Sequence, residues 1–400
     1  MPMTKPEYRV PTMAEVFALP WNGLRVASTF CGGGGSSLGY RMAGFKIIWA
    51  SEFIEEARKT YRLNAHPDTI IDPRDIRTVT ANDIFSVTGL GVGDLEILDG
   101  SPPCASFSTA GTRESSWGKR KQYSDTVQQT DDLFFEFARL VRGIQPKVFV
   151  AENVSGLIKG TAKGYFIEIL KKLESCGYRV KCRLLDAQWL GVPQSRQRVI
   201  FIGVRNDLER DPIFPLPRSY RYSLRDALPW IVSIEVDRRT SKFGQNAGGV
   251  YRPSVYKPID TITASGAGGD DRYDWKIVAP VEPEADISRY CTGREWNQLR
   301  IGEQSSRYFN LVRTDPDAPS PTICASHGSP GIASVTHPFE RRKFSIAELR
   351  RICSFPDDFK ISGSYAKQWE RLGRAVPPLM MKAISETIRD HIFDGGQRVV

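Results

Sequence analysis

The sequence predicts an α/β protein: a doubly wound, mostly parallel sheet accompanied by a smaller irregular domain. Between residues 24 and 205, short apolar runs flanked by turn residues alternate with segments of helical periodicity, which is typical of this architecture. From residue 206 to about 340, proline, glycine and aromatic residues replace the alternation, and helical periodicity then returns. We therefore divide the chain into a first domain (1–205), an irregular second domain (206–340) and a return segment (341–400) that completes the first domain.

Five apolar runs are the predicted strands. They are LRVASTF (24–30), KIIWAS (46–51), LEILDG (95–100), KVFVAEN (147–153) and RVIFIGVR (198–205). Residues 131–146 are a predicted helix, because aspartates open the segment, apolar residues recur at helical spacing, and Gly143 and Pro146 end it. Further helices are predicted at 345–355 and 378–392, and we expect the last one to pack on the first domain.

The irregular second domain contains two similar short segments. PIDTITASG (258–266) and PSPTICASHG (319–328) share the pattern Pro-x-x-Thr-Ile-x-Ala-Ser, in which Thr261 and Thr322 are equivalent. Two copies are too few for a solenoid. We interpret them as paired loop elements, with chance similarity as the alternative.

Composition and charge narrow the class of protein. The chain has no apolar run of membrane-spanning length, and its N-terminal stretch MPMTKPEYRV lacks the apolar core of a signal peptide, so we expect a cytoplasmic protein without a membrane partner. The seven cysteines are scattered and odd in number, which indicates reduced thiols and no metal site. A formal net charge of +9 favours a nucleic acid partner, with solubility alone as the alternative.

A glycine-rich turn follows the first predicted strand in RVASTFCGGGGSSLGY (25–40). Glycines there let backbone amides approach a ligand, and Glu52, about 20 residues on, is placed to bind ribose hydroxyls. Together they indicate a nucleoside cofactor, with a tight turn that binds nothing as the alternative. The dinucleotide pattern G-x-G-x-x-G fails, because Ser37 stands where its third glycine belongs, and this weakens a dehydrogenase interpretation.

A lone cysteine follows two prolines where the third predicted strand ends, in LDGSPPCASFSTAG (98–111). Pro102 and Pro103 hold Cys104 on a stiff stem, which suits a nucleophile, although a free cysteine is also a common small core residue. Two further strand ends carry polar groups, namely Glu152 with Asn153 in VFVAENVSG and three side chains in GVPQSRQRVIFIG: Gln194, Arg196 and Arg198. Taken singly, Glu152 is also readable as a capping or paired carboxylate and the arginines as a solvated strand start.

Together, these side chains supply the groups that one reaction needs. Carbon 5 of cytosine becomes nucleophilic only after a thiolate adds at carbon 6, which is a role for Cys104. The addition is easier when a carboxyl holds a proton at ring nitrogen 3 and an arginine binds the exocyclic oxygen, roles for Glu152 and for Arg196 and Arg198. A cysteine, a carboxyl and an arginine at strand ends of one sheet thus predict transfer to carbon 5.

The chain resembles the DNA (cytosine-5) methyltransferases of bacteria and phages, which use S-adenosylmethionine. The resemblance covers residues 24–205 and about 341–390 and rests on motifs in the family's usual order. They are TFCGGGGSS, SE (51–52), RDI (74–76), GSPPCASFS, ENV, QSRQR, SFPDDF and LGRAVPPLM. It implies a Rossmann-like methyltransferase fold, a covalent cysteine adduct, a flipped-out cytosine in double-stranded DNA, and residues 206–340 as the target recognition domain. It also implies a monomer, with a cognate restriction endonuclease as a further partner.

The resemblance assigns two further sets of residues. Contacts to S-adenosylmethionine are implied for Phe30, Gly32, Gly34, Glu52, Phe53, Asp75, Ile76, Pro102, Arg374, Ala375 and Val376. The segment 105–125 resembles the mobile loop that closes over DNA. Candidate DNA contacts are Ser106, Ser108, Arg113, Lys119, Arg120, Lys121, Thr261 and Thr322.

Three alternatives to DNA methylation stay open. Arg374 stands where the family has asparagine. It either has an ordinary role, turned to solvent or paired with an acidic neighbour, or binds the extra carboxylate of carboxy-S-adenosylmethionine, which would make the enzyme a carboxymethyltransferase. A tRNA methyltransferase would share the chemistry, although such relatives tend to have shorter recognition regions. A non-catalytic DNA-binding relative is disfavoured because Cys104, Glu152 and Arg196 are all present.

Overall fold

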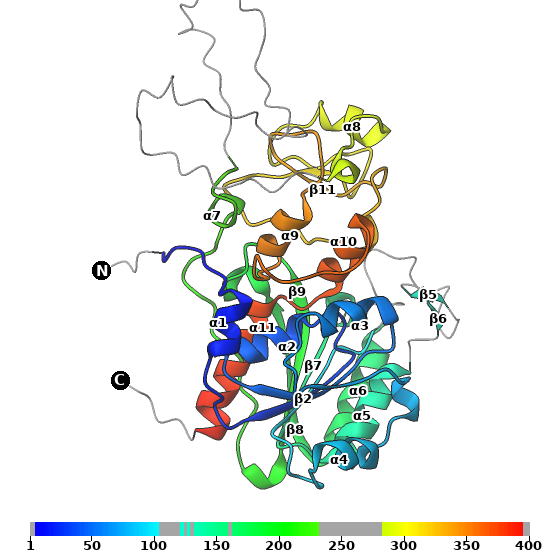
Figure 1. Cartoon of the computed structure of the whole chain (residues 1–400), viewed down its shortest axis with the longest axis vertical. Helices are drawn as coiled ribbons and strands as arrows, with labels where there is room; N and C mark the ends of the chain where they lie inside the picture. Colours follow the sequence, from blue (N-terminus) through cyan, green and yellow to red (C-terminus); the bar gives the residue numbers. More distant parts are fainter. Residues whose placement is uncertain are drawn as a thin grey trace, which may run out of the picture.

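A computed structural model describes residues 5–103, 132–158, 162–231 and 282–394, together with the backbone of two short strands, β5 (Lys121–Tyr123) and β6 (Thr126–Gln128). Its core is a seven-stranded sheet in the order β3-β2-β1-β4-β7-β9-β8, flanked by helices (Figure 1). Every neighbouring pair from β3 to β7 is parallel, whereas β9 runs antiparallel between β7 and β8. The predicted doubly wound, mostly parallel α/β fold is confirmed.

The five predicted strands all form, and the sheet has two more. The strands are β1 (Arg25–Thr29), β2 (Lys46–Ser51), β3 (Ile70–Asp72), β4 (Ile97–Gly100), β7 (Val148–Val154), β8 (Tyr178–Asp186) and β9 (Gln197–Arg205). The sequence analysis missed β3 because it is three residues long, and missed β8 because Arg179, Lys181 and Arg183 interrupt its apolar residues. These three cations are exposed on an edge strand, where charge discourages pairing with another chain.

Helices cover both faces of the sheet, and further helices lie beyond its end and in the irregular lobe (Figure 1). The described helices are α1 (Met13–Ala18), α2 (Gly35–Met42), α3 (Glu55–Arg62), α4 (Ala81–Thr88), α5 (Leu133–Ile144), α6 (Ala162–Glu174), α7 (Leu224–Ala227), α8 (Cys291–Trp296), α9 (Ile346–Ile352), α10 (Tyr365–Arg374) and α11 (Pro378–Ile388). Apolar residues of α2, α9 and α11 share one core, and those of α4, α5 and α6 share the other. The predicted helix at 131–146 is α5, but Gln145 with φ 52° ends it in place of Gly143.

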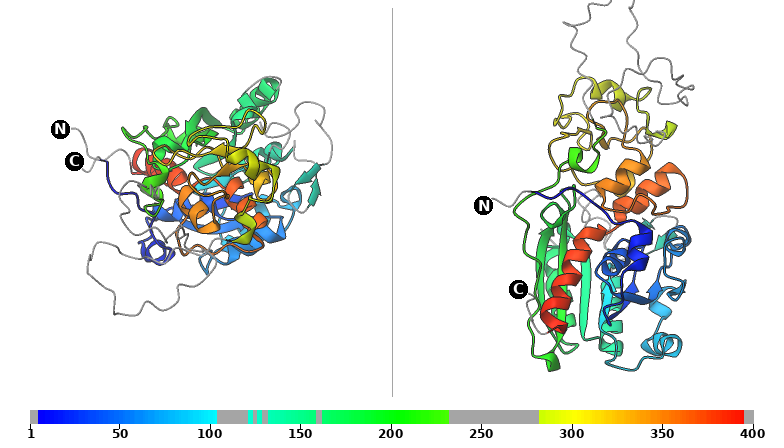
Figure 2. Two further views of the ribbon diagram at one scale, coloured as in Figure 1. Left: turned by 90° about the horizontal axis from the view of Figure 1, so that it is seen from above. Right: turned by 60° about the vertical axis from the view of Figure 1, so that its left-hand side comes forward.

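Helix α11 packs directly on α2. A Cβ atom on Gly39 of α2 would lie 2.6 Å from both the Met381 Cβ and the Pro378 carbonyl oxygen, so only glycine permits this approach. The right-hand view of Figure 2 shows α11 running alongside the sheet together with the N-terminal helices. Two segments far apart in the sequence therefore build one core.

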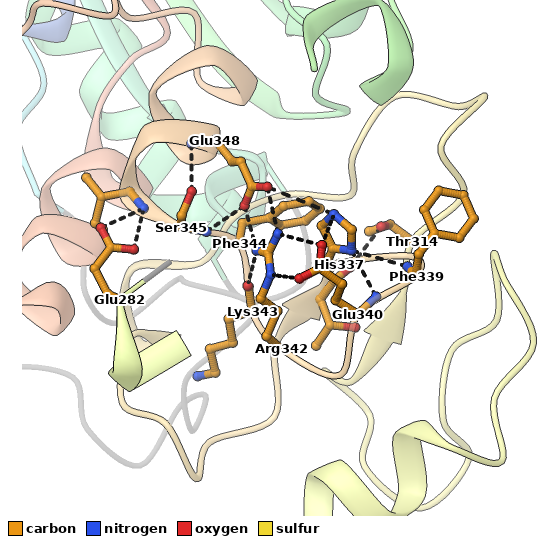
Figure 3. A network of polar contacts seen from close by, with 12 residues as sticks. Glu282, Thr314, His337, Phe339, Glu340, Arg342, Lys343, Phe344, Ser345 and Glu348 are labelled. Carbon is orange, nitrogen blue, oxygen red and sulfur yellow. Dashed lines mark hydrogen bonds and ion pairs between the residues drawn. The ribbon is translucent and has the colours of Figure 1, made fainter. Parts of the chain in front are cut away.

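Residues 282–343 form a lobe with little regular structure, in which β10 (Val312–Arg313) and β11 (Val335–Thr336) pair. A buried polar network joins this lobe to α9 (Figure 3). Its centre is a bidentate ion pair in which Arg342 donates to both carboxylate oxygens of Glu348, at 2.7 and 2.9 Å. The Ser345 backbone amide also donates to Glu348, which fixes the start of α9. Within the described ranges, no helix has the length and apolar character needed to cross a bilayer.

Candidate active site

A cavity of about 520 Å³ opens at the carboxyl ends of the parallel strands, between the sheet, the segment 322–326 and the end of α10. This is the edge where open α/β sheets bind ligands, and the volume is in the usual range for a small-molecule site. Most of the predicted cofactor residues line it. They are Phe30, Gly32, Glu52, Phe53, Asp75, Ile76, Pro102, Arg374, Ala375 and Val376.

The glycine-rich turn shapes one wall of the cavity. Phe30 and Gly32 adopt positive φ angles of 53° and 55°, which turn the chain sharply between β1 and α2. A Cβ atom on Gly35 would lie 2.4 Å from the Val376 carbonyl oxygen, so the start of α2 packs tightly on the segment after α10. Gly34 does not line the cavity. It faces the Tyr61 ring with φ 97°, and we therefore assign it a role in the loop conformation in place of the predicted ligand contact.

Glu52 lies at the end of β2 with its carboxylate already held in place. Its two oxygens accept hydrogen bonds from the Gly32 amide at 2.8 Å and the Ile54 amide at 2.7 Å. Burial raises the pKa of Glu52, and the two amides oppose this shift. The neighbouring Phe53 ring is 44% exposed at the cavity, where a flat aromatic ligand can stack on it.

Asp75 caps a short 3-10 turn and accepts a hydrogen bond from the Arg77 amide at 3.0 Å. The Arg77 side chain pairs with Asp75 and also with Asp132, at 2.8 Å, at the start of α5. Asp75 and Ile76 therefore border the cavity on a braced turn, close to the point where the described chain resumes after residue 131.

Glu152 and Arg198 form an ion pair inside the cavity, with the Arg198 Nε atom 2.7 Å from Glu152 Oε1. They belong to neighbouring antiparallel strands, β7 and β9, which places both side chains at one end of the sheet. The adjacent Asn153 donates to the Pro102 carbonyl oxygen at 3.2 Å. Asn153 thereby fixes the proline stem that precedes Cys104 beside the ion pair.

Arg196 is almost fully buried and binds backbone carbonyls. Its Nη1 donates to Ile323 at 3.3 Å and its Nη2 to Gly373 at 2.9 Å, while its buried Nε has no hydrogen-bond partner among the described residues. The pKa of Arg196 is lowered to about 9, mainly by burial and in smaller part by the charge of Arg198. The same junction includes Thr322, whose hydroxyl donates to the Ser195 carbonyl at 2.6 Å. Arg196 thus ties the strand β9 to the segment 322–326 and to α10.

Arg374 lines the cavity but has a protein partner. Its Nε donates to Glu370 Oε1 at 2.9 Å, one helical turn earlier in α10. Lys367 and Arg371 also lie within 4 Å of the Glu370 carboxylate, at 3.8 and 3.6 Å. The charge of Arg374 is therefore met by a carboxylate of the chain itself, the first of the two alternatives that the sequence left open.

Several predicted residues lie outside the described ranges. They are Cys104, Ser106, Ser108, Arg113, Lys119, Arg120 and Thr261, and for Lys121 only the backbone of β5 is described. Two residues in or behind the cavity wall were missed by the sequence analysis. Arg371 lines the cavity although only 5% exposed, and Asp99 is buried behind the glycine-rich turn. The signal for Asp99 was present, because a carboxylate inside the apolar run LEILDG needs hydrogen-bond partners.

A doubly wound sheet with a glycine-rich turn after β1, an acidic residue after β2 and a ligand cavity above both defines a Rossmann-like protein with a site suited to a nucleoside cofactor. The family model for C-5 cytosine-specific DNA methylases matches residues 24–390. The chain belongs to this family.

Individual relatives agree with the family. The Type II methyltransferase M.DdeI of Desulfomicrobium norvegicum is 30% identical over 396 residues, spanning 91% of this chain and 88% of that protein. M1.HphI of Haemophilus parahaemolyticus is 29% identical, spanning 90% of this chain and 85% of that protein. In fold, the chain is similar to an E. coli protein described as a prophage-encoded DNA modification methyltransferase. That structure has a TM-score of 0.64 at 21% identity and covers 93% of this chain and 100% of its own.

Proposed function

We propose that the chain methylates carbon 5 of a flipped-out cytosine in DNA, with S-adenosylmethionine as methyl donor. The observation that carries the proposal is the Glu152–Arg198 pair, which stands in the cavity beside the stem of Cys104. Ring nitrogen 3 and the exocyclic oxygen of cytosine are adjacent, so a carboxyl and a guanidinium on neighbouring strands match them as a pair.

The cavity fits the cofactor. Glu52, already oriented by two amides, is placed to accept hydrogen bonds from ribose hydroxyls, and the exposed face of Phe53 suits the adenine. Asp75 and Ile76 lie on the braced turn nearby, where we propose that they contact the adenine edge. We propose that Pro102, Ala375 and Val376 enclose the rest of the cofactor. When bound, S-adenosylmethionine supplies an electrophilic methyl group on a sulfonium.

The residues then divide the chemistry. The Cys104 thiolate bonds to carbon 6, and the displaced electron pair reaches nitrogen 3, which takes a proton held at Glu152. With the cofactor bound, carbon 5 would take the methyl group as the methyl–sulfonium bond breaks and S-adenosylhomocysteine is left. Loss of the carbon 5 proton to a base would then re-form the ring double bond as the bond between carbon 6 and the Cys104 sulfur breaks, and the proton on nitrogen 3 would return to Glu152. The Cys104 sulfur leaves with the bonding electrons and is ready for another cycle.

Arg198 and Arg196 have different roles in this proposal. Arg198 is paired with Glu152 and is the donor to the exocyclic oxygen of the base. Two of the five N–H donors of Arg196 bind the Ile323 and Gly373 carbonyls, and its buried Nε has no partner among the described residues. Arg196 mainly holds the wall of the cavity in position.

We further propose that the chain acts on double-stranded DNA as a monomer in the cytoplasm. The loop residues Ser106, Ser108, Arg113, Lys119, Arg120 and Lys121, with Thr261 and Thr322, are proposed to contact DNA. The names of M.DdeI and M1.HphI as type II methyltransferases favour a restriction–modification setting with a cognate endonuclease. The ion pair of Arg374 with Glu370 favours ordinary S-adenosylmethionine over its carboxylated form.

One experiment tests product and substrate together. DNA and tRNA from a host that expresses the chain are digested to nucleosides and analysed by mass spectrometry, with the Glu152→Gln variant as the control. We expect 5-methylcytosine in the DNA, absent in the variant. Unmodified DNA with methylated tRNA would contradict the DNA assignment, and 5-carboxymethylcytosine would contradict the cofactor assignment.

A further inference from the structure

One buried carboxylate oxygen of Asp99 connects three elements beside the cavity, namely β4, β1 and the start of α2. Asp99, in β4, is 2% exposed and does not line the cavity. Its Oδ2 accepts hydrogen bonds from the Ser28 hydroxyl at 2.9 Å and from the Ser36 hydroxyl at 2.8 Å. A polar side chain buried in this way persists only because its hydrogen bonds replace those to water.

The two serines stand on either side of the glycine-rich turn. Ser28 lies in β1, two residues before Phe30, and Ser36 lies in the first turn of α2 and lines the cavity. Asp99 itself is five residues before Cys104 on the strand that leads to the proline stem. The carboxylate therefore fixes the entry to the turn, its exit and the start of the stem relative to one another.

The surroundings of Asp99 hold its proton more tightly than water does. The pKa of Asp99 is raised to about 7, mainly by burial and in smaller part by the charge of Glu152 on β7, while the hydrogen bonds of the two serines oppose the shift. Three other titratable groups face it: Tyr40 of α2, Cys31 of the turn and Tyr61 of α3. The pKa of each is raised, mainly by burial, so all three stay neutral near pH 7.

We propose that Asp99 is a positioning residue that supports the cofactor site in its ionised form, so that binding of the cofactor releases a proton from Asp99 to the solvent. Two hydroxyls that donate to the same oxygen are satisfied best by a carboxylate, because it accepts without offering a proton. The bound cofactor carries a sulfonium and an ammonium against one carboxylate, and a negative charge behind the Ser36 wall favours it. This inference rests on the proposed use of S-adenosylmethionine.

The pH dependence has a definite sign. Below pH 7 Asp99 holds a proton that binding must expel, so cofactor affinity weakens as pH falls, by up to about tenfold per pH unit. Above pH 7 Asp99 is ionised before binding, and its contribution to the pH dependence disappears. Reciprocity requires that the ligand, once bound, lower the pKa of Asp99.

Calorimetry measures this proton directly. We would titrate the full chain at pH 6.5 with S-adenosylhomocysteine and with sinefungin, whose amine replaces the sulfonium, in two buffers of different ionisation enthalpy. The wild-type chain should release roughly half to one proton per ligand, more with sinefungin, and Asp99→Asn should release none. The difference in binding heat between the two buffers gives the number of protons released, and this number does not depend on how tightly the ligand binds.

Two variants keep the test informative. Glu52 lines the cavity and also has a raised pKa, so Glu52→Gln should bind more weakly but still release the proton. Ser36→Ala retains the Asp99 carboxylate and removes one hydrogen bond to its ionised form, so proton release should persist to higher pH. If Asp99→Asn does not fold, the comparison of Ser36→Ala with the wild type is the test.

The outcomes separate the two proposals. Equal proton release by the wild type and Asp99→Asn, or loss of release in Glu52→Gln alone, would overturn the role of Asp99. Binding of neither ligand to the wild type at any pH would instead remove the proposed cofactor, and this inference with it.

Discussion

Glu152 and Arg198 are the residues at which the structure is most specific about chemistry. Their side chains are only 11% and 12% exposed, and they meet at 2.7 Å within the cavity. An ion pair with this little solvent around it is strongly oriented, which is what a site needs to present a carboxyl and a guanidinium to one flat base.

Glu152→Gln should reduce the rate of methyl transfer about 100-fold or more, because an amide still hydrogen-bonds to the ring but cannot pass a proton. A single-turnover assay with saturating DNA and cofactor measures this rate. DNA affinity, measured by fluorescence anisotropy, should change little. An unchanged single-turnover rate would remove Glu152 from the proton transfer.

Arg196 and Arg198 should fail in different ways although they are two residues apart. Arg196→Met removes two hydrogen bonds to buried carbonyls and should cost about 2–4 kcal/mol of unfolding free energy, measured by denaturant titration. Arg198→Met should unfold closer to the wild type and lose single-turnover rate. The opposite pattern would reassign the base contact to Arg196.

The sequence could predict that a residue belongs to the site where that residue stands in a local motif. Glu52, Glu152 and Arg198 stand at strand ends and line the cavity as a group. The partners of Arg196 could not be predicted, because Ile323 and Gly373 are brought to it by two other parts of the chain. The sequence likewise predicted only that Arg374 could pair with an acidic neighbour, and the structure of α10 identifies that neighbour as Glu370.

At the scale of the element, strands with continuous apolar runs were predictable and edge strands were not. Strands β1, β2, β4, β7 and β9 lie inside the sheet, and each includes consecutive buried residues with apolar side chains, so the sequence reveals them. β8 is an edge strand whose alternate cations face solvent, and β3 is too short for any periodicity. The antiparallel insertion of β9 depends on long-range pairing, which no local pattern encodes.

The contact between α2 and α11 yields a matched pair of glycine variants. Gly39→Ala places a Cβ atom 2.6 Å from the Pro378 oxygen and should lower the unfolding free energy by about 1–3 kcal/mol. Gly164→Ala in α6 meets nothing within 4 Å and should be neutral or stabilise by about 0.5–1 kcal/mol. Denaturant titration of both variants measures the difference, and equal effects would mean that α2 and α11 can separate at little cost.

At the scale of the molecule, the buried network of Arg342 and Glu348 connects the irregular lobe to the sheet domain (Figure 3). Glu348→Gln leaves the Arg342 guanidinium buried without its full counter-charge and should cost about 3 kcal/mol. Glu340→Gln removes a partner that is 45% exposed and should cost about 1 kcal/mol or less. Thermal unfolding of the two variants compares them, and similar shifts would show that the network does not anchor the lobe.

The same network should make the molecule sensitive to acid. Burial and the charge of Arg342 lower the pKa of His337 to about 4, so the folded state keeps this side chain neutral while the unfolded chain binds a proton below about pH 6.5. Stability should therefore fall as pH decreases from 6.5 to 4, by up to about 3 kcal/mol. His337→Gln should flatten the melting temperature over this range, and an unchanged profile would assign the acid sensitivity elsewhere.

The packing of α11 on α2 also has a consequence for synthesis. Helix α2 leaves the ribosome early, but the apolar side chains that cover it arrive with Pro378–Ile388. At about ten residues per second, the wait is roughly half a minute. During that time the nascent domain exposes the apolar face that α11 covers and lacks the Val376 wall of its cavity. The chain would thus complete its cavity only at the end of its synthesis, and chaperones that bind nascent chains would meet it before DNA does.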